Sequence, residues 1–176
     1  MRLLKKSELF LASLLLIGAA DSSFAQTARS ADVESISAIL TATYDAISGD
    51  AGERRDWDRF RSLFAAGATL SYVSSGQQGE VGRTVMTPDE YIERSGANLE
   101  RNGFFETEIH RVTERFGNIA HVFSTYESRR QESDPAPFAR GINSFQLMFD
   151  GKRWYVVSIY WQGETGQASI PPEYLP

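Results

Sequence analysis

Four long runs of strand-forming residues dominate the second half of the chain and restrict the folds open to it. They span Phe104 to Phe116, Ile119 to Arg130, Phe138 to Phe149 and Arg153 to Gln162. Turn residues, Gly117-Asn118 and Asp150-Gly151, separate the first pair and the last pair. The pattern predicts four antiparallel strands, long enough that their sheet must twist and curl strongly.

In the first half of the chain, apolar residues recur mainly with the period of an α-helix. Apolar residues between Val33 and Ile47 recur at steps of three and four and end before Gly49, which predicts a helix. Asp56 is the predicted N-cap of a second, short helix, and Ala68 to Val73 is predicted to be a strand. Ser74 to Arg83 is rich in Gly, Ser and Gln, so we expect a mobile loop there.

A third helix begins with the clearest local signal in the sequence. Thr87, Pro88 and Glu90 have the spacing of a capping box with proline at the first helical position. The helix is predicted to reach about Arg101 and to end at Asn102-Gly103. Three helices and one strand before four long strands is an α+β order. We therefore expect three N-terminal helices packed on a strongly curved antiparallel sheet, as a cone with an apolar pocket between the layers.

The N-terminus has the three parts of a secretory signal peptide. Arg2, Lys5 and Lys6 precede an apolar run from Leu9 to Ala20, and a short polar stretch ends at Ala25. The alternative is a membrane-spanning helix, which needs about 20 apolar residues, so this run is too short. We expect cleavage after Ala25 and an exported protein, periplasmic or secreted.

The chain is then expected to divide into a signal peptide, a flexible lead-in, one domain and a C-terminal tail, over residues 1–25, 26–32, 33–164 and 165–176. It has no cysteine, which excludes a disulfide framework and a lipoprotein anchor. Removing the leader subtracts three basic and two acidic side chains, so the net charge changes from −5 to −6. An acidic surface argues against nucleic acid, or an anionic membrane, as the partner of the mature chain.

Three short motifs carry a family resemblance. They are Asp56 to Phe64 before the first predicted strand, Gly117 to Val122, and Asp150 to Val157. In order and spacing they resemble the nuclear transport factor 2-like (NTF2-like) superfamily, also called SnoaL-like, over nearly the whole mature chain. The resemblance implies the cone-shaped α+β fold. It leaves the function open among isomerases, dehydratases, epoxide hydrolases, cyclases and non-catalytic binding or dimerisation modules.

Two catalytic branches of that superfamily can be compared with this chain. Ketosteroid isomerases resemble it around Leu70 but carry a carboxylate base two residues later, where this chain has Tyr72, so the resemblance does not extend to that base. Scytalone-dehydratase-like proteins share the helix start Asp56-Trp57-Asp58-Arg59 and a tyrosine matching Tyr72, which in them holds a catalytic water. They also have an acid–base histidine close to the place of His110. Their Tyr-Asp pair is Gly52-Glu53 here and their second histidine has no clear counterpart, so dehydratase chemistry is implied only in part.

The two histidines, His110 and His121, are the natural acid–base candidates because histidine titrates near neutral pH. Neighbouring residues of a strand face opposite sides, so register decides what each can reach. His121 is expected on the outer face of the sheet, whereas inward and outward positions are both open for His110. The spacing of the histidines is not that of a metal site, and no motif indicates a cofactor. The inward set around His121 is predicted to be Ala120, Val122, Ser124 and Tyr126.

Our first hypothesis for function is a small-molecule enzyme of lyase or isomerase type. Tyr72 would donate a hydrogen bond to a carbonyl group of a small cyclic compound, and His110 would be the acid–base. Aromatic residues with polar tips, and two polar residues at the mouth of the cone, are predicted to bind the ligand: Tyr44, Trp57, Tyr126, Tyr160, Arg140 and Asn143.

Two other hypotheses use the same residues differently. One is a non-catalytic periplasmic ligand-binding protein, and the other is a homodimerisation module whose pocket is filled by core side chains. In that case the tyrosine hydroxyls find partners within the core, and Arg140 pairs with a carboxylate such as Glu127 or Glu106. Under any of the three we expect homodimerisation through an apolar outer face of the sheet.

Overall fold

A computed structural model describes residues 27–75 and 80–176, and the predicted signal peptide lies outside this range. The strands are β1 (Phe64–Ser75), β2 (Val81–Met86), β3 (Phe105–Phe116), β4 (Ile119–Arg129), β5 (Ala139–Phe149) and β6 (Trp154–Gly163). The helices are α1 (Ser30–Val33), α2 (Ile36–Ile47), α3 (Trp57–Ser62), α4 (Pro88–Tyr91), the π-helical η1 (Ile92–Gly96), α5 (Ala97–Asn102) and the 3₁₀ helix η2 (Pro172–Tyr174).

The six strands form one open sheet in the order β2-β1-β6-β5-β4-β3. The four long strands predicted from the sequence are confirmed, and β3 to β6 are antiparallel neighbours in chain order. Two details differ from the prediction. β1 lies parallel to β6, so the sheet is mixed, and β2 forms a hairpin with β1 where a loop was predicted. The predicted loop therefore contains the ends of two strands, and only residues 76–79 lie outside the described range.

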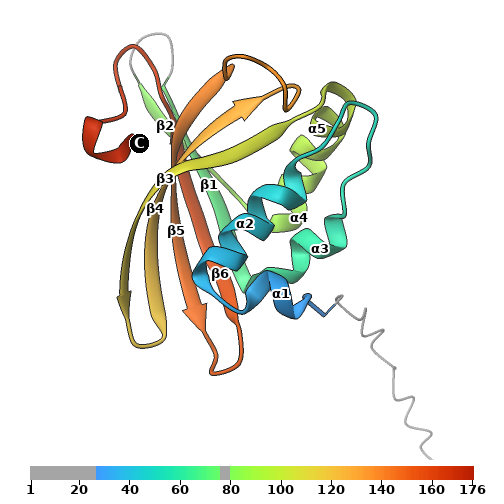
Figure 1. Cartoon of the computed structure of the whole chain (residues 1–176), viewed down its shortest axis with the longest axis vertical. Coiled ribbons are helices and arrows are strands. Elements are labelled where there is room, and N and C mark those ends of the chain that lie inside the picture. The colour runs from blue at the N-terminus through green and yellow to red at the C-terminus, as the bar shows by residue number, and fades with distance from the viewer. Residues whose placement is uncertain (1–26, 76–79) are drawn as a thin grey trace, which may run out of the picture.

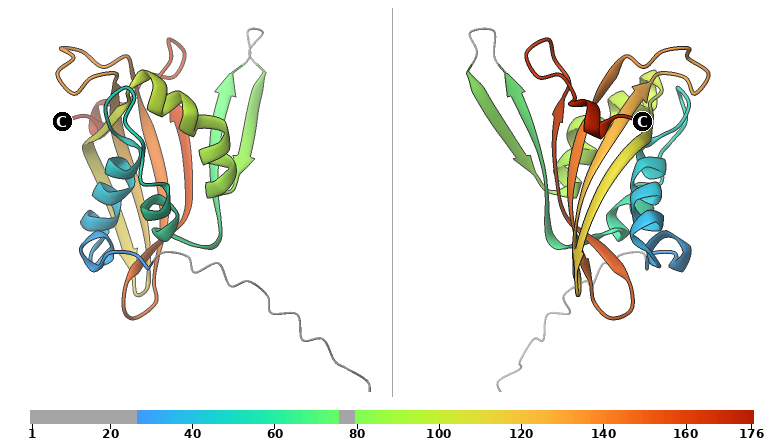
Figure 2. Two further views of the ribbon diagram at one scale, coloured as in Figure 1. Left: turned by 90° about the vertical axis from the view of Figure 1, so that its right-hand side faces the viewer. Right: turned by 60° about the vertical axis from the view of Figure 1, so that its left-hand side comes forward.

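The helices α1 to α5 all cover one side of the curved sheet (Figure 1). The other side is open, apart from the C-terminal segment that lies on it (Figure 2). This confirms an α+β fold with helices packed on a curved sheet. The long helix of the cover, α2, buries seven of its twelve residues and begins at Ser35, whose hydroxyl accepts from the Ala38 amide.

The predicted helix starts are confirmed by their caps. The Asp56 carboxylate accepts from the Arg59 amide at the start of α3. Thr87 and Glu90 form both hydrogen bonds of the capping box at the start of α4. The helical segment that follows runs through η1 and α5 to Asn102, and it ends at Gly103, which has a φ of 68°.

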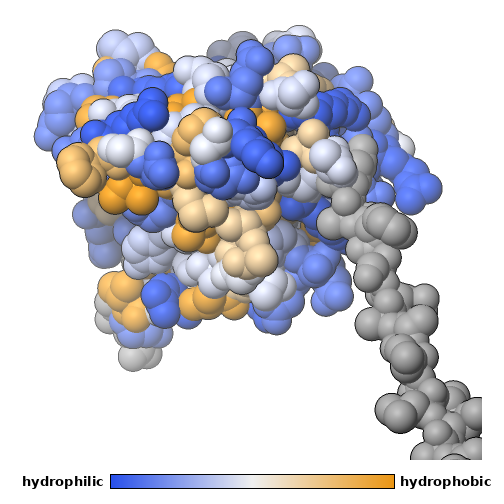
Figure 3. Space-filling model, turned by 90° about the horizontal axis from the view of Figure 1, so that it is seen from below, coloured by the Kyte–Doolittle hydropathy of each residue, from blue (hydrophilic) through white to orange (hydrophobic). Residues whose placement is uncertain are grey.

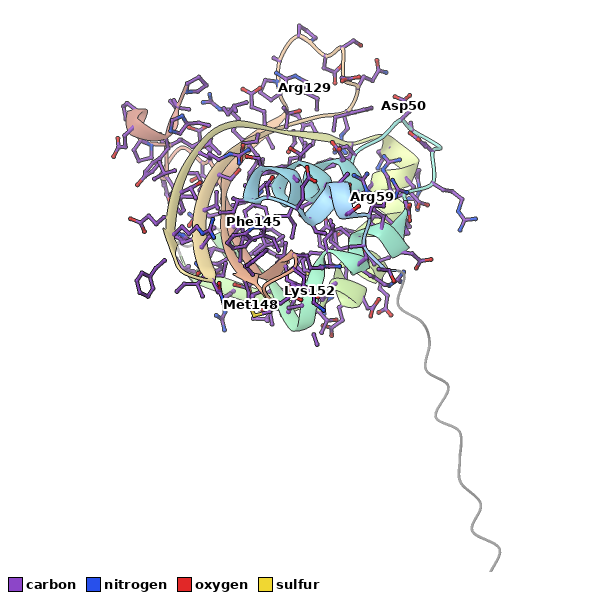
Figure 4. All side chains as sticks on the ribbon, turned by 60° about the horizontal axis from the view of Figure 1, so that its bottom comes forward. Asp50, Arg59, Arg129, Phe145, Met148 and Lys152 are labelled. Atoms are coloured by element: carbon purple, nitrogen blue, oxygen red, sulfur yellow. The ribbon has the colours of Figure 1, made fainter. Side chains whose placement is uncertain are left out.

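The core lies between the helices and the inner face of the sheet. Ile39 and Leu40 of α2 have no exposed surface, and neither do Val122 of β4 and Val156 of β6. Figure 4 shows Phe145 of β5 pointing into this space beneath the helices. The inward set predicted for β4 is confirmed, because Ala120, Val122, Ser124 and Tyr126 are all buried there.

The N-terminal segment predicted as a flexible lead-in contains ordered structure. Residues Ser30–Val33 form α1, and Asp32 is 8% exposed. Both carboxylate oxygens of Asp32 accept from the Arg59 guanidinium, at 2.8 and 2.9 Å. This bidentate pair ties α1 to α3, and a polar composition alone could not predict it.

The C-terminal segment covers part of the outer face. Ile170 is 7% exposed, and the Thr125 hydroxyl donates to the Tyr174 carbonyl oxygen at 2.7 Å. The rings of Phe123 and Tyr174 pack edge to face. Residues 165–176 thus pack against β4 and the neighbouring strands. Among the residues that the structure describes, no helix is long and apolar enough to cross a membrane.

Candidate functional site

A cavity of about 450 Å³ lies between the inner face of the sheet and the helices. Most of its surface is apolar, and the apolar residues that line it are Ile47, Phe60, Leu70, Leu99, Phe104, Phe138, Ala139, Phe145, Ile159 and Trp161. Its polar lining consists of Thr43, Tyr44, Tyr91, Arg94, Ser95, Asn98, Glu106, Tyr126, Ser128 and Asn143. A hollow whose surface is mainly apolar and carries convergent polar groups has the usual character of a small-molecule site.

Glu106 is the carboxylate of this cavity. Its Oε1 accepts from Asn143 Nδ2 at 3.2 Å, and its Oε2 accepts from Ser128 Oγ at 3.1 Å. No cation pairs with it in the described part of the chain. Burial raises the pKa of Glu106 to about 7, against the weaker downward effect of the hydrogen bonds from Ser128 and Asn143. The group is therefore close to half ionised near neutral pH, as an acid–base catalyst requires.

A hydrogen-bonded chain leads from Glu106 to a second carboxylate, Glu108. Asn143 Nδ2 also donates to the Tyr44 hydroxyl at 3.2 Å, and Tyr44 lies 2.7 Å from Ser124 Oγ. Ser124 in turn donates to Glu108 Oε2 at 2.5 Å. Because Ser124 uses its proton on Glu108, the Tyr44 hydroxyl must donate to Ser124. Tyr44 therefore orients the chain and has no proton left for a ligand.

The hydroxyls of Tyr91 and Tyr126 have no hydrogen-bond partner among the described residues. Burial, and after it the charge of Glu106, raises the pKa of both phenols well above the usual range, so both stay protonated. Gly141 makes room for Tyr126, since a Cβ there would lie 2.5 Å from the tyrosine oxygen. The cavity thus combines one titratable carboxylate with two free phenolic donors.

His110 lies on the other face of the sheet. Its register partner is Thr125, whose hydroxyl bonds the C-terminal segment on the outer side. Glu108 faces inward opposite Tyr126, and a bulge at Ile109 follows it. A bulge of one residue reverses the facing of every later side chain, so Arg111 points inward and His110 outward. The facing of His110 was left open by the sequence, and its outward position keeps it away from the cavity in which the first hypothesis needed it together with Tyr72.

The other predicted site residues divide between the two faces. Tyr44, Tyr126 and Asn143 line the cavity, as predicted for ligand-binding residues. Tyr72 packs against Trp161, with ring centroids 5.7 Å apart, beside the cavity rather than on its wall. Trp57 packs on Phe60, outside the lining, and its indole nitrogen donates to the Glu100 carboxylate at 2.9 Å.

Arg140, Tyr160 and His121 lie on the outer face. Arg140 pairs with Glu164 at 2.9 Å, so the expected carboxylate pairing occurs with a different partner. Tyr160 is 45% exposed. His121 lies outward as predicted, with Nε2 3.0 Å from Ser144 Oγ and Nδ1 3.7 Å from the exposed carboxylate of Glu114. None of these residues reaches the cavity.

The sequence reasoning did not identify Glu106, Tyr91 or Arg94 as site residues. One signal was available for Glu106. Glu106 and Glu108 are two residues apart in a strand, so both carboxylates lie on the same face of β3. The exposed residues of β3 are concentrated at its other end, and the two carboxylates lie at the end close to the helices. In residues 27–75 and 80–176, no group of three or more His, Asp or Glu side chains is placed to hold a metal ion.

Comparison with known proteins finds relatives by structure alone. No protein-family model matches the chain, and no curated protein sequence matches it. A predicted dehydratase from the NTF2-like family of Streptomyces avermitilis is 18% identical with a TM-score of 0.53. The match covers 77% of this chain and 97% of that one.

Two further structures are similar. The β subunit of a predicted aromatic-ring-hydroxylating dioxygenase from Novosphingobium aromaticivorans has a TM-score of 0.56 at 11% identity, over 75% of this chain and 88% of that one. An NTF2-like protein of unknown function from Silicibacter pomeroyi has a TM-score of 0.50 at 17% identity, over 74% and 94%. Identities this low establish the fold alone, and with the helix-covered six-stranded sheet they show that the chain has the nuclear transport factor 2-like fold.

Proposed function

We propose that the chain binds a small, largely apolar carbonyl compound in the cavity and moves a proton on it, with Glu106 as the acid–base group. The observation that carries this proposal is the Glu106 carboxylate, which has no ion-pair partner in the described range and a pKa raised to about 7, on the wall of an apolar cavity of about 450 Å³. Perturbed titratable groups in such a hollow mark candidate catalytic sites.

The chemistry follows from the groups present. The Glu106 carboxylate takes a proton from the carbon beside the carbonyl, and the electron pair of the C–H bond moves toward the carbonyl oxygen. The hydroxyl of Tyr126 or Tyr91 donates to that oxygen as its charge grows. Protonated Glu106 then returns the proton to another carbon, which isomerises the compound, or to a leaving β-hydroxyl, which departs as water. These are the isomerase and lyase reactions expected from the sequence, with a different base.

The test uses 2-tetralone, an apolar bicyclic ketone with acidic hydrogens beside its carbonyl. Exchange of these hydrogens for deuterium is followed by proton NMR in deuterated buffer, with wild type and Glu106→Gln. Glutamine keeps the shape but cannot take the proton, so we expect exchange to fall by about 100-fold or more. Glu114→Gln is the matched control, because Glu114 lies on the same strand with its side chain 79% exposed on the outer face.

Equal exchange in wild type and Glu106→Gln would contradict the proposal. If 2-tetralone binds but exchange never exceeds the buffer rate, the cavity serves binding alone, which is the second hypothesis drawn from the sequence.

Export and homodimerisation are also proposals. The leader described above supports export, and cell fractionation tests it.

Exposed apolar side chains on the outer face support a dimer, among them Val112, Phe116 and Ile119, which are 41%, 84% and 60% exposed. Viewed from the end with the β3–β4 and β5–β6 turns, the hydrophobic residues gather in separate patches (Figure 3). Sedimentation equilibrium on wild type and Phe116→Lys distinguishes a dimer from a monomer.

A further inference from the structure

One wall of the cavity is the helical segment from Pro88 to Asn102, and its middle turn, η1, is π-helical. Single π turns inside α-helices occur often at functional sites. The residues of this segment that line the cavity are Tyr91, Arg94, Ser95, Asn98 and Leu99. Leu99 is buried and Tyr91 is half-buried, whereas Arg94 and Asn98 are exposed. The exposed residues therefore mark the mouth of the cavity, and the buried ones mark its interior.

The mouth presents hydrogen-bond donors that have no acceptor in the part of the chain that the structure describes. Arg94 makes no ion pair within the described residues. The carboxylate of Glu90, one helical turn away, accepts from the Thr87 amide in the capping box. Its pKa is lowered mainly by the hydrogen bonds with Thr87 and more weakly by the charge of Arg94, and the neighbouring Glu93 is exposed. Asn98 Oδ1 accepts from Asn102 Nδ2 at 2.7 Å, and Asn98 Nδ2 has no acceptor among residues 27–75 and 80–176. The Ser95 hydroxyl also has no partner in the described range.

The two ends of the cavity thus carry charges of opposite sign. The inner end carries Glu106, which repels an anion, and the mouth carries the Arg94 guanidinium beside two neutral donors. A carboxylate on a ligand would be excluded from the inner end and attracted to the mouth, where charge-assisted hydrogen bonds are available. At the inner end, a neutral carbonyl oxygen would instead accept hydrogen bonds from the hydroxyls of Tyr91 and Tyr126.

We propose that the ligand is an apolar keto acid, bound with its carbonyl group beside Glu106 and its carboxylate at Arg94, Ser95 and Asn98. This substrate class rests on the function proposed above, because it assigns the inner end to the carbonyl group. Arg94 is in this view a residue that determines specificity, and it takes no part in proton transfer.

The test compares two probes with the same body, 3-(4-acetylphenyl)propanoate and its methyl ester. Calorimetric titration is carried out on wild type, Arg94→Gln and Arg101→Gln. Arg101 is the matched control, because it is exposed on the same helical segment and does not line the cavity. We expect wild type to bind the acid about five- to tenfold more tightly than the ester, with a preference that weakens as salt is added.

Arg94→Gln should remove this preference and leave the ester affinity unchanged, whereas Arg101→Gln should keep it. No preference in wild type, no binding of either probe, or an equal loss for acid and ester in Arg94→Gln would overturn the proposal. Exchange on 2-tetralone reports separately on Glu106. Exchange that persists without a preference for the acid would contradict the keto-acid assignment alone. A preference for the acid without exchange would contradict the proton-transfer function alone.

Discussion

Glu106 and Glu108 lie two residues apart on β3, face the same side of the sheet and belong to one hydrogen-bonded chain, yet their surroundings differ. Glu108 accepts from the Arg111 guanidinium at 2.6 Å and from Ser124 at 2.5 Å. Among the described residues, Glu106 accepts only from the neutral groups of Ser128 and Asn143, beside an apolar cavity. A cation favours the ionised form of a carboxylate and burial opposes it. Glu108 is therefore held in an ion pair with Arg111, whereas Glu106 has no charged partner among the described residues and titrates near neutral pH.

The largest expected effect is on the pH dependence of exchange. Because Glu106 must be ionised to accept a proton and its pKa is about 7, the rate should fall about tenfold per pH unit below pH 7 and level off above it. A rate profile with 2-tetralone from pH 5 to pH 9 measures this. A midpoint near pH 4.5 would show that Glu106 behaves like an ordinary solvated carboxylate, and would contradict its role as the acid–base group.

The next effect is on stability. The folded pKa of Glu106, about 7, lies above its ordinary value of 4.5. Between these values the unfolded chain loses the proton that the folded chain keeps, so stability falls as pH rises from 4.5 to 7 and then levels off. Glu106→Gln should remove this loss and raise the free energy of unfolding by up to about 3 kcal/mol at pH 8, with little change at pH 4.5. Urea unfolding at both pH values measures it, and an equal gain at both would contradict the assignment.

A smaller effect is expected from removing the cation of Glu108. Arg111→Met leaves the Glu108 carboxylate without its ion pair, which should cost about 1–2 kcal/mol at pH 7, since the two side chains are 29% and 16% exposed. Adding Glu108→Gln should restore most of the loss, because the double variant has no unpaired charge. Urea unfolding of the single and double variants tests this, and additive losses would show that the two residues are not coupled.

The smallest expected effects distinguish Tyr126, whose hydroxyl is free to bind a ligand, from Tyr44, whose hydroxyl is hydrogen-bonded within the protein. Tyr126→Phe removes a hydroxyl that has no partner among the described residues, so it should slow exchange about tenfold with little change in stability. Tyr44→Phe removes the link between Asn143 and Ser124 and should cost about 1 kcal/mol of stability. NMR exchange and urea unfolding on both variants provide the measurements. The reverse pattern would mean that Tyr44, and not Tyr126, faces the ligand.

Much of the fold could be predicted because local signals decide it. Strand period and turn residues located β3 to β6 to within a residue or two, and the side chains of Asp56 and Thr87 marked helix starts through their own caps. The strand β2 was missed, because Ser74 to Arg83 has the composition of a loop. That strand exists through its pairing with β1, a contact that composition does not encode.

The candidate site was predictable only in part. Tyr44 was predicted on the apolar face of a helix and Tyr126 on the inward face of a strand, and both line the cavity. Asn143 was predicted at the mouth of the cone, and it also lines the cavity. His110 was left open because its facing depends on one bulge, at Ile109. Arg140 was predicted at the mouth of the cone but pairs on the outer face with Glu164, from beyond the end of β6.

By itself, the sequence determined the order of the three main helical segments, the first strand and the four long strands, together with the caps of two helices. All of these depend on neighbours within a few residues. The tertiary structure decided which carboxylate of β3 meets a cation and which meets the cavity. That choice depends on a bulge that turns Arg111 inward beside Glu108, and on helices that enclose Glu106 from elsewhere in the chain. Burial and charge at a single atom are set by the whole packed molecule, and so, therefore, is the chemistry of Glu106.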